Sequence, residues 1–182
     1  MTDYRRNRVP GGTFFFTVNL RDRSAGLLAT HVDALRAAVR QVRDGAPFHA
    51  DAWVILPDHM HCLWTLPEGD ADYPGRWKAI KILFSKSLPK SETRSPVMLR
   101  RGERGIWQRR YWEHTIRDER DYAAHMDYIH FNPVNHGYVK HAADWPYSTF
   151  RRCVIRGIYD LDWDASEDDV AAMEDMGERA LD

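Results

Sequence analysis

His59 and His61 stand two residues apart in an apolar run that has the composition of a β-strand. Alternate residues of a strand point to the same face, so both imidazoles would converge there. Neutral imidazole is a common ligand of divalent metals, and two such groups make half of a metal site. The chain holds 9 histidines, however, so this spacing alone is equally compatible with chance on a partly exposed strand. Cys62 would point to the opposite face and is not expected to be a third ligand.

Tyr128 and Asn132 lie four residues apart, which places them on one face of a helix. His125 extends the same stripe. A tyrosine one turn before a carboxamide brings a nucleophile and a metal-ligating oxygen to one place. The competing interpretation is a tyrosine that packs by its ring and leaves its hydroxyl at the surface. Three other tyrosines compete for the role of nucleophile on residue types alone: Tyr111, Tyr122 and Tyr138.

The elements that must position these side chains are strands and helices in alternation. Apolar residues recur at every second position from Phe14, which predicts a strand over 13–20 with one buried face. The apolar spacing then becomes helical and predicts a helix over 30–44, with Thr30 and Asp33 resembling a capping pair.

Two strand-like runs, 52–56 and 60–66, are joined by Pro57 and Asp58, a pair that favours a turn and hence a hairpin. An amphipathic helix follows, with Trp77 predicted to lie in the core. A polar loop over 89–104 comes next and is a candidate mobile element.

Residues 106–116 predict a fourth strand or extended segment, and Asp118 is expected to cap a third helix. That helix should end near Asn132, because a proline at 133 disfavours helical geometry at the residue before it. The order of elements predicts an α+β fold: a ferredoxin-like, four-stranded antiparallel sheet with packed helices. The histidine pair would lie on a central strand of this sheet.

The formal net charge of −1 conceals a strong asymmetry along the chain. Residues 160–182 hold ten acidic side chains and one basic one, so residues 1–159 carry a charge of +8. This pattern predicts one domain over 1–159 that meets a polyanionic partner, and an acidic C-terminal tail over 160–182. The tail is a candidate competitor for the basic surface.

The sequence favours a cytoplasmic protein that does not interact with membranes. It has no apolar run near the roughly 20 residues of a membrane span and no apolar stretch typical of a signal peptide. Its two cysteines, Cys62 and Cys153, form neither a CxxC motif nor a disulfide framework.

Several of these segments together resemble the REP-associated tyrosine transposases of bacteria. These are relatives of the single-tyrosine insertion-sequence transposases within the HUH endonucleases. The resemblance spans about residues 4–163, and its motifs occur in the family's order. They are residues 4–6, 11–20, 53–61, 107–114, 128–134 and 144–149.

This resemblance implies roles for individual residues. His59 and His61 correspond to the metal-binding HUH pair and Tyr128 to the nucleophile. Asn132 corresponds to a third metal ligand, at a position where insertion-sequence relatives have glutamine. The resemblance thus implies a metal-dependent single-stranded DNA endonuclease and strand transferase that uses Mg²⁺ or Mn²⁺. It would act on hairpins of repetitive extragenic palindromes (REP) through a 5′-phosphotyrosine intermediate.

Basic residues interleaved with aromatic rings are the candidates for DNA contact. Residues 76–120 hold 13 basic and 5 acidic side chains among several aromatic residues, a mixture typical of single-strand binding. A solvated basic helix over core aromatics is the competing interpretation. The basic arm before Gly11 could lie against a hairpin's flanking tetranucleotide. The residues expected to bind nucleic acid are Arg5, Arg6, Arg8, Lys78, Lys81, Arg109 and Arg110.

Two further expectations concern partners and function. A monomer is favoured, and a homodimer is possible. The alternative function, from another class, is a domesticated DNA-hairpin binding protein that keeps the fold and the basic surface but has no significant turnover.

Overall fold

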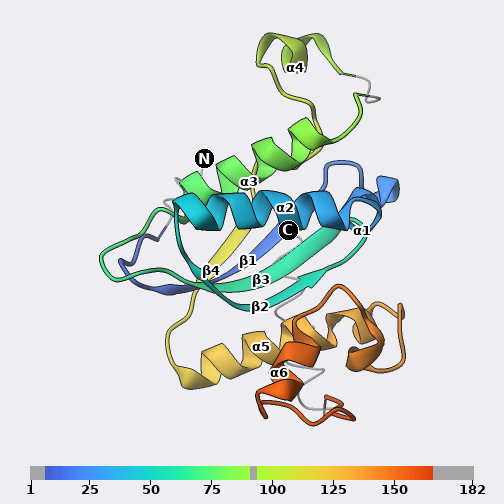
Figure 1. The fold of residues 1–182 in the computed structure, drawn as a ribbon. Coiled ribbons are helices and arrows are strands. Elements are labelled where there is room, and N and C mark those ends of the chain that lie inside the picture. The colour runs from blue at the N-terminus through green and yellow to red at the C-terminus, as the bar shows by residue number, and fades with distance from the viewer. Residues whose placement is uncertain (1–6, 91–93, 166–182) are drawn as a thin grey trace, which may run out of the picture.

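A four-stranded antiparallel sheet forms the centre of the protein, seen in a computed structural model that describes residues 7–90 and 94–165 (Figure 1). The strand order is β2-β3-β1-β4. This order, with one helical crossover before β2 and another before β4, is the ferredoxin-like arrangement, so the predicted α+β fold is confirmed. The strands are β1 (Thr13–Asn19), β2 (His49–Ile55), β3 (His59–Thr65) and β4 (Trp112–Thr115).

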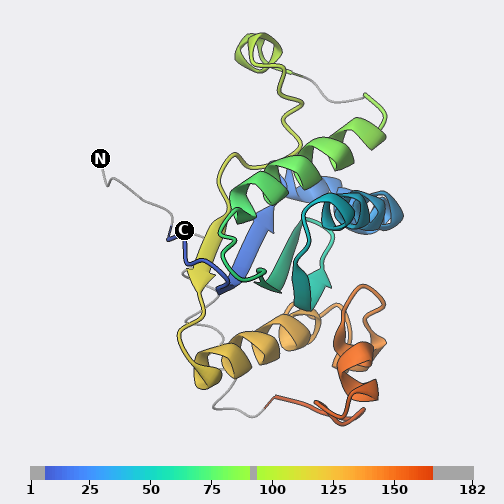
Figure 2. The same ribbon diagram turned by 60° about the vertical axis from the view of Figure 1, so that its left-hand side comes forward.

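Helices lie on both sides of the sheet (Figures 1 and 2). On one side are α2 (Val32–Gly45) and α3 (Tyr73–Ser87); on the other are α5 (Glu119–Asn135) and α6 (Phe150–Ile155). The short elements are η1 (Arg23–Ala25), α1 (Leu27–Thr30), α4 (Pro96–Arg100) and η2 (Ala142–Asp144).

The two sides of the sheet carry separate hydrophobic cores, because successive strand residues point to opposite faces. Phe16, Trp64 and Trp77 belong to the core under α2 and α3, as expected for Trp77. Phe15 belongs to the core under α5. The expectation that β1 buries only one face was therefore wrong: α5 covers the second face, where Phe15 and Thr17 are fully buried.

The start of the first long helix differs from its prediction. α2 begins at Val32, its N-cap is His31, and no side chain caps it. Thr30 instead ends the preceding α1 and donates its hydroxyl to the Gly26 carbonyl oxygen at 3.0 Å. The proposed Thr30 and Asp33 capping pair does not form, because Thr30 is itself helical and its hydroxyl bonds backwards along the chain.

The end of α5 also differs, since the helix continues to Asn135 with Pro133 inside it. Asn132 and Pro133 are both buried, and the His136 N–H closes the last turn on the Asn132 carbonyl oxygen at 3.0 Å. Tertiary burial here outweighs the local cost of proline. Consequently the helical stripe that holds Tyr128 extends one turn beyond the predicted end.

Two predicted segments contain different structure. The polar loop includes α4, whose first turn is capped by the Ser95 hydroxyl accepting from the Met98 N–H at 3.3 Å. The fourth strand is confined to β4, and Trp107 forms only an isolated bridge with Leu20.

The chain remains packed against the protein beyond residue 159, where the domain was predicted to end. The Trp163 ring lies 4.7 Å from Tyr159 and 5.9 Å from Phe150, centroid to centroid. Residues 166–182, which hold most of the acidic tail, lie outside the described residues. No helix in the described ranges is long and apolar enough to cross a membrane.

Candidate active site

The histidine pair lies at the start of β3, next to the turn from β2, on the face of the sheet that α5 covers. His59 pairs with Asn19 and His61 with Thr17 in the ladder between β1 and β3. Both histidines are almost fully buried, at 2% and 1% exposure, and their ring centroids are 4.9 Å apart. Cys62 lies in the opposite core, as the strand alternation predicted.

The side chains of Asp58 and Thr17 fix the orientations of the two rings. Nδ1 of His59 lies 2.7 Å from Asp58 Oδ1, and Nδ1 of His61 lies 2.9 Å from the Thr17 hydroxyl. In each ring the bonded nitrogen is Nδ1, so Nε2 is left for another ligand. Hydrogen bonds of this kind set the tautomer and direction of metal-binding histidines.

Arg23 completes the surroundings of the Asp58 carboxylate. Its Nε donates to Asp58 Oδ2 at 2.5 Å. Burial alone would raise the pKa of Asp58, but hydrogen bonds and positive charge from His59 and Arg23 outweigh burial and hold that pKa well below its usual value. The carboxylate therefore remains charged beside His59. Sequence reasoning missed Arg23, because nothing in its spacing links it to the hairpin.

His61 is held neutral by its surroundings. Burial lowers its pKa well below the ordinary value, and the neighbouring His59 and His136 lower it further. Its Nε2 atom is buried and has no hydrogen-bond partner among the described residues. A buried, neutral imidazole with an unsatisfied nitrogen has the chemistry of a metal ligand.

Helix α5 brings Tyr128 to the histidine pair, and Asn132 follows one turn later on the same face of the helix. The Tyr128 ring lies 5.0 Å from the His61 ring at 76°, and Tyr128 is 6% exposed. Burial raises the pKa of Tyr128 to about 12, although its interaction with the Asn132 side chain lowers it in part. We call His59, His61, Tyr128 and Asn132 the His/Tyr site.

Asn132 supplies a second unsatisfied acceptor. Its Oδ1 atom is buried without a partner in the described part of the chain, as is Nε2 of His61. An amide oxygen and neutral imidazoles fit Mn²⁺, and fit Mg²⁺ when waters or phosphate oxygens complete its shell. The residues present thus fit a divalent metal.

His136 is a neighbour of this site that sequence reasoning missed. Its side chain is exposed, yet its ring centroid lies 5.3 Å from that of His59. Partial burial lowers its pKa, and the adjacent His59 adds to the effect. The signal that could have found it is its spacing, four residues after Asn132 on the same helical stripe.

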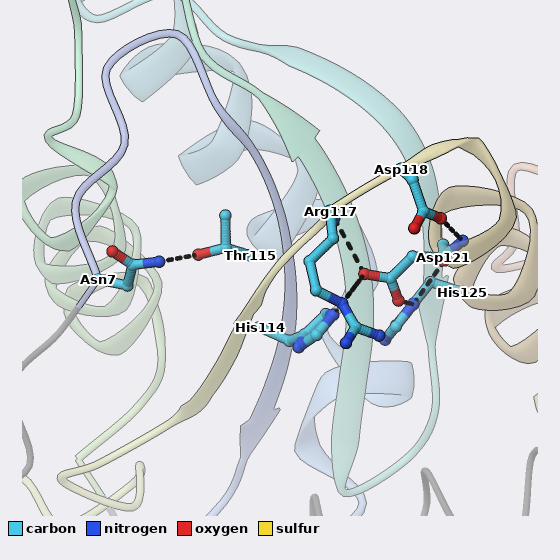
Figure 3. A network of polar contacts seen from close by, with 7 residues as sticks. All are labelled: Asn7, His114, Thr115, Arg117, Asp118, Asp121 and His125. Atoms are coloured by element: carbon cyan, nitrogen blue, oxygen red, sulfur yellow. Dashed lines mark hydrogen bonds and ion pairs between the residues drawn. The ribbon is translucent and has the colours of Figure 1, made fainter.

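His125 belongs to a different group, shown in Figure 3. His114 Nε2 lies 2.8 Å from Asp121 Oδ2, to which Arg117 donates both its backbone N–H and its Nε at 3.0 Å. His125 Nδ1 lies 2.8 Å from the Asp121 backbone oxygen. We call these four residues the Asp121 network. Phe15 packs between His125 and Tyr128, with its ring 4.7 Å from the first and 5.7 Å from the second.

Three members of the Asp121 network could hold a metal ion, because ligand atoms of His114, Asp121 and His125 all lie within 4.8 Å of one another. Each of these atoms already has a hydrogen-bond partner, however. The Arg117 guanidinium also occupies one oxygen of the carboxylate. The unsatisfied acceptors of the His/Tyr site make it the better metal candidate.

The competing tyrosines lie in other environments. Tyr122 donates its hydroxyl to Asp51 Oδ1 at 3.1 Å, and Tyr111 packs against Trp77 on the opposite side of the sheet. Tyr138 is 45% exposed and contacts the His136 ring at 6.0 Å. Among these tyrosines, Tyr128 is the one whose ring faces the histidine pair.

The described residues among those expected to bind DNA do not form one surface around the His/Tyr site. Lys78 and Lys81 belong to α3, which lies across the sheet from α5 (Figure 1). Lys81 donates to the Gln108 carbonyl oxygen at 3.1 Å, and Arg109 pairs with Glu103 at 3.0 Å.

Arg8 and Arg110 are exposed, whereas Arg5 and Arg6 lie outside the described residues. Residues 109 and 110 lie just before β4, an edge strand of the sheet, with Tyr111 between them and the strand. DNA that touches both α3 and Tyr128 would therefore have to pass around an edge of the sheet.

Comparison with known proteins gives close relatives over the whole chain. A REP-associated tyrosine transposase from Escherichia coli K12 is 49% identical over 181 residues, covering 100% of this chain and 99% of the relative. A Haemophilus influenzae protein that bears the same family name is 46% identical over 170 residues, covering 92% and 96%. No protein-family model matches the chain.

A solved structure has the same fold. It is a REP-associated tyrosine transposase bound to a REP hairpin, with a TM-score of 0.79 and 49% identity, covering 91% of this chain and 93% of that chain. Identity at this level over the full length shows common ancestry as well as common architecture. The chain belongs to the family of REP-associated tyrosine transposases.

Proposed function

We propose that the protein is a metal-dependent single-stranded DNA endonuclease and strand transferase that acts on REP-type hairpins. The observation that carries this proposal is the position of Tyr128, whose ring lies 5.0 Å from His61 on the face where Nε2 of His61 and Oδ1 of Asn132 are unsatisfied. A nucleophile and a set of metal-ligand atoms thus share one buried location.

His59, His61 and Asn132 would hold the divalent ion, Mg²⁺ or Mn²⁺. When bound, that ion would supply positive charge for the scissile phosphate and for a developing phenolate. Asp58 and Thr17 would keep both imidazoles in the required direction through the hydrogen bonds at Nδ1.

In the proposed reaction, Oη of Tyr128 forms a bond to phosphorus while the bond from phosphorus to the 3′ oxygen breaks. The phenol loses its proton to solvent, and the departing oxygen takes one up to become a 3′-hydroxyl. The 5′ side of the break stays attached to Tyr128. A 3′-hydroxyl from another end can reverse the attack and rejoin strands without ATP.

DNA as the substrate is supported by charge and by the relative. Residues 1–159 carry +8, and the solved relative is bound to a REP hairpin. The substrate should be single-stranded at the cut, because a paired strand would block the approach of a helix-borne tyrosine to the phosphate. The proposed DNA contacts are Arg5, Arg6, Arg8, Lys78, Lys81, Arg109 and Arg110.

A monomer suffices for this chemistry. The histidine pair and the tyrosine come from one chain, so a single copy assembles the whole His/Tyr site. The outer edge of β2 is also occupied by the chain itself, since Ile55 N–H donates to the Tyr147 oxygen at 2.8 Å and Val54 bridges Ser148. Pairing of two sheets through this edge would require that segment to move.

One observation favours the alternative of a hairpin binding protein without significant turnover. Tyr128 is 6% exposed and its pKa is raised to about 12, so its hydroxyl is both shielded and protonated near neutral pH. An enzyme must overcome both conditions when metal and DNA bind, whereas a binding protein need not.

Covalent trapping distinguishes the two functions. The parent protein is incubated with a single-stranded REP hairpin and Mg²⁺ or Mn²⁺, and adducts are resolved on a denaturing gel. We expect an adduct in the parent and in Tyr138→Phe, the matched control, and none in Tyr128→Phe, which should still bind the hairpin. Absence of an adduct in the parent, with binding intact, would establish the alternative.

A further inference from the structure

A cavity of about 300 Å³ lies beside the β2 edge of the sheet, between α2 and the chain that leads into α6. Its wall comes from one face of α2, from β2 and from the segment 147–152. Trp53 and Ile55 line it, and they point to the α2 side of the sheet, away from the His/Tyr site. We call it the arginine cavity, after the four arginines described below. It is separate from the His/Tyr site.

The charge of the cavity wall has one sign. Four arginines line it, namely Arg36, Arg40, Arg43 and Arg152, and no aspartate or glutamate does. Of the nearby carboxylates, Asp33 pairs with Arg36 of the wall itself at 3.5 Å, whereas Asp51 accepts from Tyr122 and Thr65 outside the cavity. Such a wall attracts an anion.

Within the described ranges, Arg36 is the one arginine of the wall that has a carboxylate partner. Arg40 and Arg43 are exposed and lie on one face of α2, and neither forms an ion pair there. The Arg43 guanidinium sits 5.7 Å from the Phe48 ring centroid. Both therefore keep hydrogen-bond donors for a ligand.

Two of the residues at the wall also hold buried donor atoms that a ligand in the cavity does not reach. Nε1 of Trp53 and Nε of Arg152 are buried without an acceptor in the described structure, and Trp53 is only 8% exposed. Arg152 is already fixed in place, because its Nη2 donates to the carbonyl oxygens of Ala50 and Asp51 at 2.6 and 2.8 Å. The exposed guanidinium groups of Arg40 and Arg43 are therefore the groups that a ligand in the cavity can contact, and they favour an anionic, acceptor-rich ligand.

The wall also contains an aromatic ring, which indicates that the ligand has a planar group besides its negative charge. Tyr147 is half-buried, and the Arg36 guanidinium lies 5.7 Å from its ring centroid. In a nucleotide, the phosphate oxygens would pair with the arginines and the planar base would stack on the aromatic ring. The volume of about 300 Å³ suits one nucleotide and is too small for a duplex.

The β2 strand connects this cavity with the His/Tyr site through the thickness of the sheet. Val54 pairs with His61, and the next pair along the ladder joins Ile55, which lines the cavity, to Met60. A single strand that crosses the β2 edge over Tyr147 would reach both faces. A duplex stem is too wide to do so.

We propose that the arginine cavity binds one nucleotide of the single-stranded flank of the hairpin substrate. Arg40 and Arg43 contact its phosphates and Tyr147 stacks on its base. This inference rests on the proposed function for the identity of the DNA, and it adds a binding site across the sheet from the tyrosine.

The test uses the full chain and the double variant Arg40→Gln/Arg43→Gln. Binding is measured by fluorescence anisotropy at several salt concentrations, with one hairpin that has single-stranded flanks and one without them. We expect about tenfold weaker binding of the flanked hairpin, and a salt slope that is shallower by about 1.4, from about 0.7 for each lost single-strand phosphate contact. Binding of the flankless hairpin should not change.

The matched control is Arg120→Gln/Arg156→Gln, which removes the same charge from two exposed arginines outside the cavity. It should alter binding of both hairpins alike. Equal effects of the cavity variant on both hairpins, or an unchanged salt slope, would overturn the proposal.

A second pair of variants tests the base. Tyr147→Ala should weaken binding of the flanked hairpin about tenfold, whereas Tyr147→Phe, which keeps the ring, should bind like the parent. Binding of a deoxynucleoside monophosphate without any difference between the two hairpins would mean that the cavity takes free nucleotides, and would overturn the assignment to DNA.

The proposed function is judged separately. At saturating DNA the parent and the control variant Arg120→Gln/Arg156→Gln should form equal amounts of covalent adduct on Tyr128, because the control changes no residue of the cavity or of the His/Tyr site. A parent without adduct would refute turnover while leaving the contrast between the two hairpins interpretable.

Discussion

Nδ1 of His59 donates to the carboxylate of Asp58 across 2.7 Å, so a residue in the β2 to β3 turn fixes the ring of the residue that follows it. Arg23 holds the other carboxylate oxygen at 2.5 Å. A ring held in this way presents Nε2 in one direction, as metal-binding histidines do when a carboxylate accepts from the other ring nitrogen.

We therefore predict that Asp58→Asn lowers the affinity for Mn²⁺ about 10- to 100-fold, the usual cost of losing a carboxylate behind a ligating histidine. The measurement is isothermal titration with Mn²⁺ on the metal-free protein. Asp144→Asn, which alters an exposed carboxylate, is the control and should bind like the parent. An unchanged affinity in Asp58→Asn would mean that His59 is not a metal ligand.

Asn132 and His125 allow the two metal-capable groups to be told apart. Asn132→Ala removes an unsatisfied oxygen from the His/Tyr site, so it should weaken Mn²⁺ binding at least tenfold and change the free energy of unfolding little. His125→Gln disrupts the Asp121 network and should lower that free energy while leaving Mn²⁺ affinity intact. The opposite pattern would place the metal at His114, Asp121 and His125.

The strands that carry the site could be predicted from the sequence, because apolar residues recur at every second position and alternate side chains of a strand point to the same face. That period placed His59 and His61 on one face and Cys62 on the other, as observed. The partners of the rings could not be predicted, since Thr17 and Arg23 reach the site only through the pairing of β1 with β3 and through η1.

Predictions from local sequence were wrong where tertiary packing determined the structure. Pro133 indicated a helix end, but the packing of α5 on the sheet carries the helix to Asn135 and brings His136 to His59. His125 shares a stripe with Tyr128, yet its ring nitrogen bonds to Asp121, and Phe15 contacts both rings. Helical spacing gives the face of a residue, and only the packed neighbours determine which site it joins.

The phenol of Tyr128 should remain protonated in the metal-free protein well above neutral pH, because burial raises its pKa to about 12. Difference absorbance near the tyrosinate band, parent minus Tyr128→Phe, should show no titration below about pH 11. Mn²⁺ should shift the titration to lower pH, since a nearby cation favours the phenolate. A difference signal that titrates near pH 10 without metal would show that Tyr128 is solvated.

The Asp121 network should make stability depend on pH in the acid range. Burial alone would raise the pKa of Asp121, but hydrogen bonds from His114 and Arg117 outweigh it and lower the pKa to about 2, from 3.8 in the unfolded chain. This stabilisation is complete above about pH 4 and is lost as the pH falls through 2. It amounts to about 2 kcal/mol at neutral pH.

Urea unfolding of Asp121→Asn tests this. Relative to the parent, the variant should lose about 1–2 kcal/mol of unfolding free energy at pH 7, and the deficit should shrink toward pH 2 as the parent's carboxylate becomes protonated. Asp44→Asn, at an exposed carboxylate, should show no such trend. If the variant's unfolding free energy were lower than the parent's by the same amount at both pH values, the loss would be due to packing and not to the charge of Asp121.

Removal of residues 166–182 should raise DNA affinity. That segment carries seven acidic side chains and one basic one, so we expect it to compete electrostatically with DNA for the basic part of the chain. The truncation must retain Trp163, because its ring packs on Tyr159 and Phe150. Anisotropy with a REP hairpin should show several-fold tighter binding at low salt and a smaller gain at high salt, where the tail's charge is screened. Equal binding with and without the segment at every salt concentration would show that the tail does not compete with DNA.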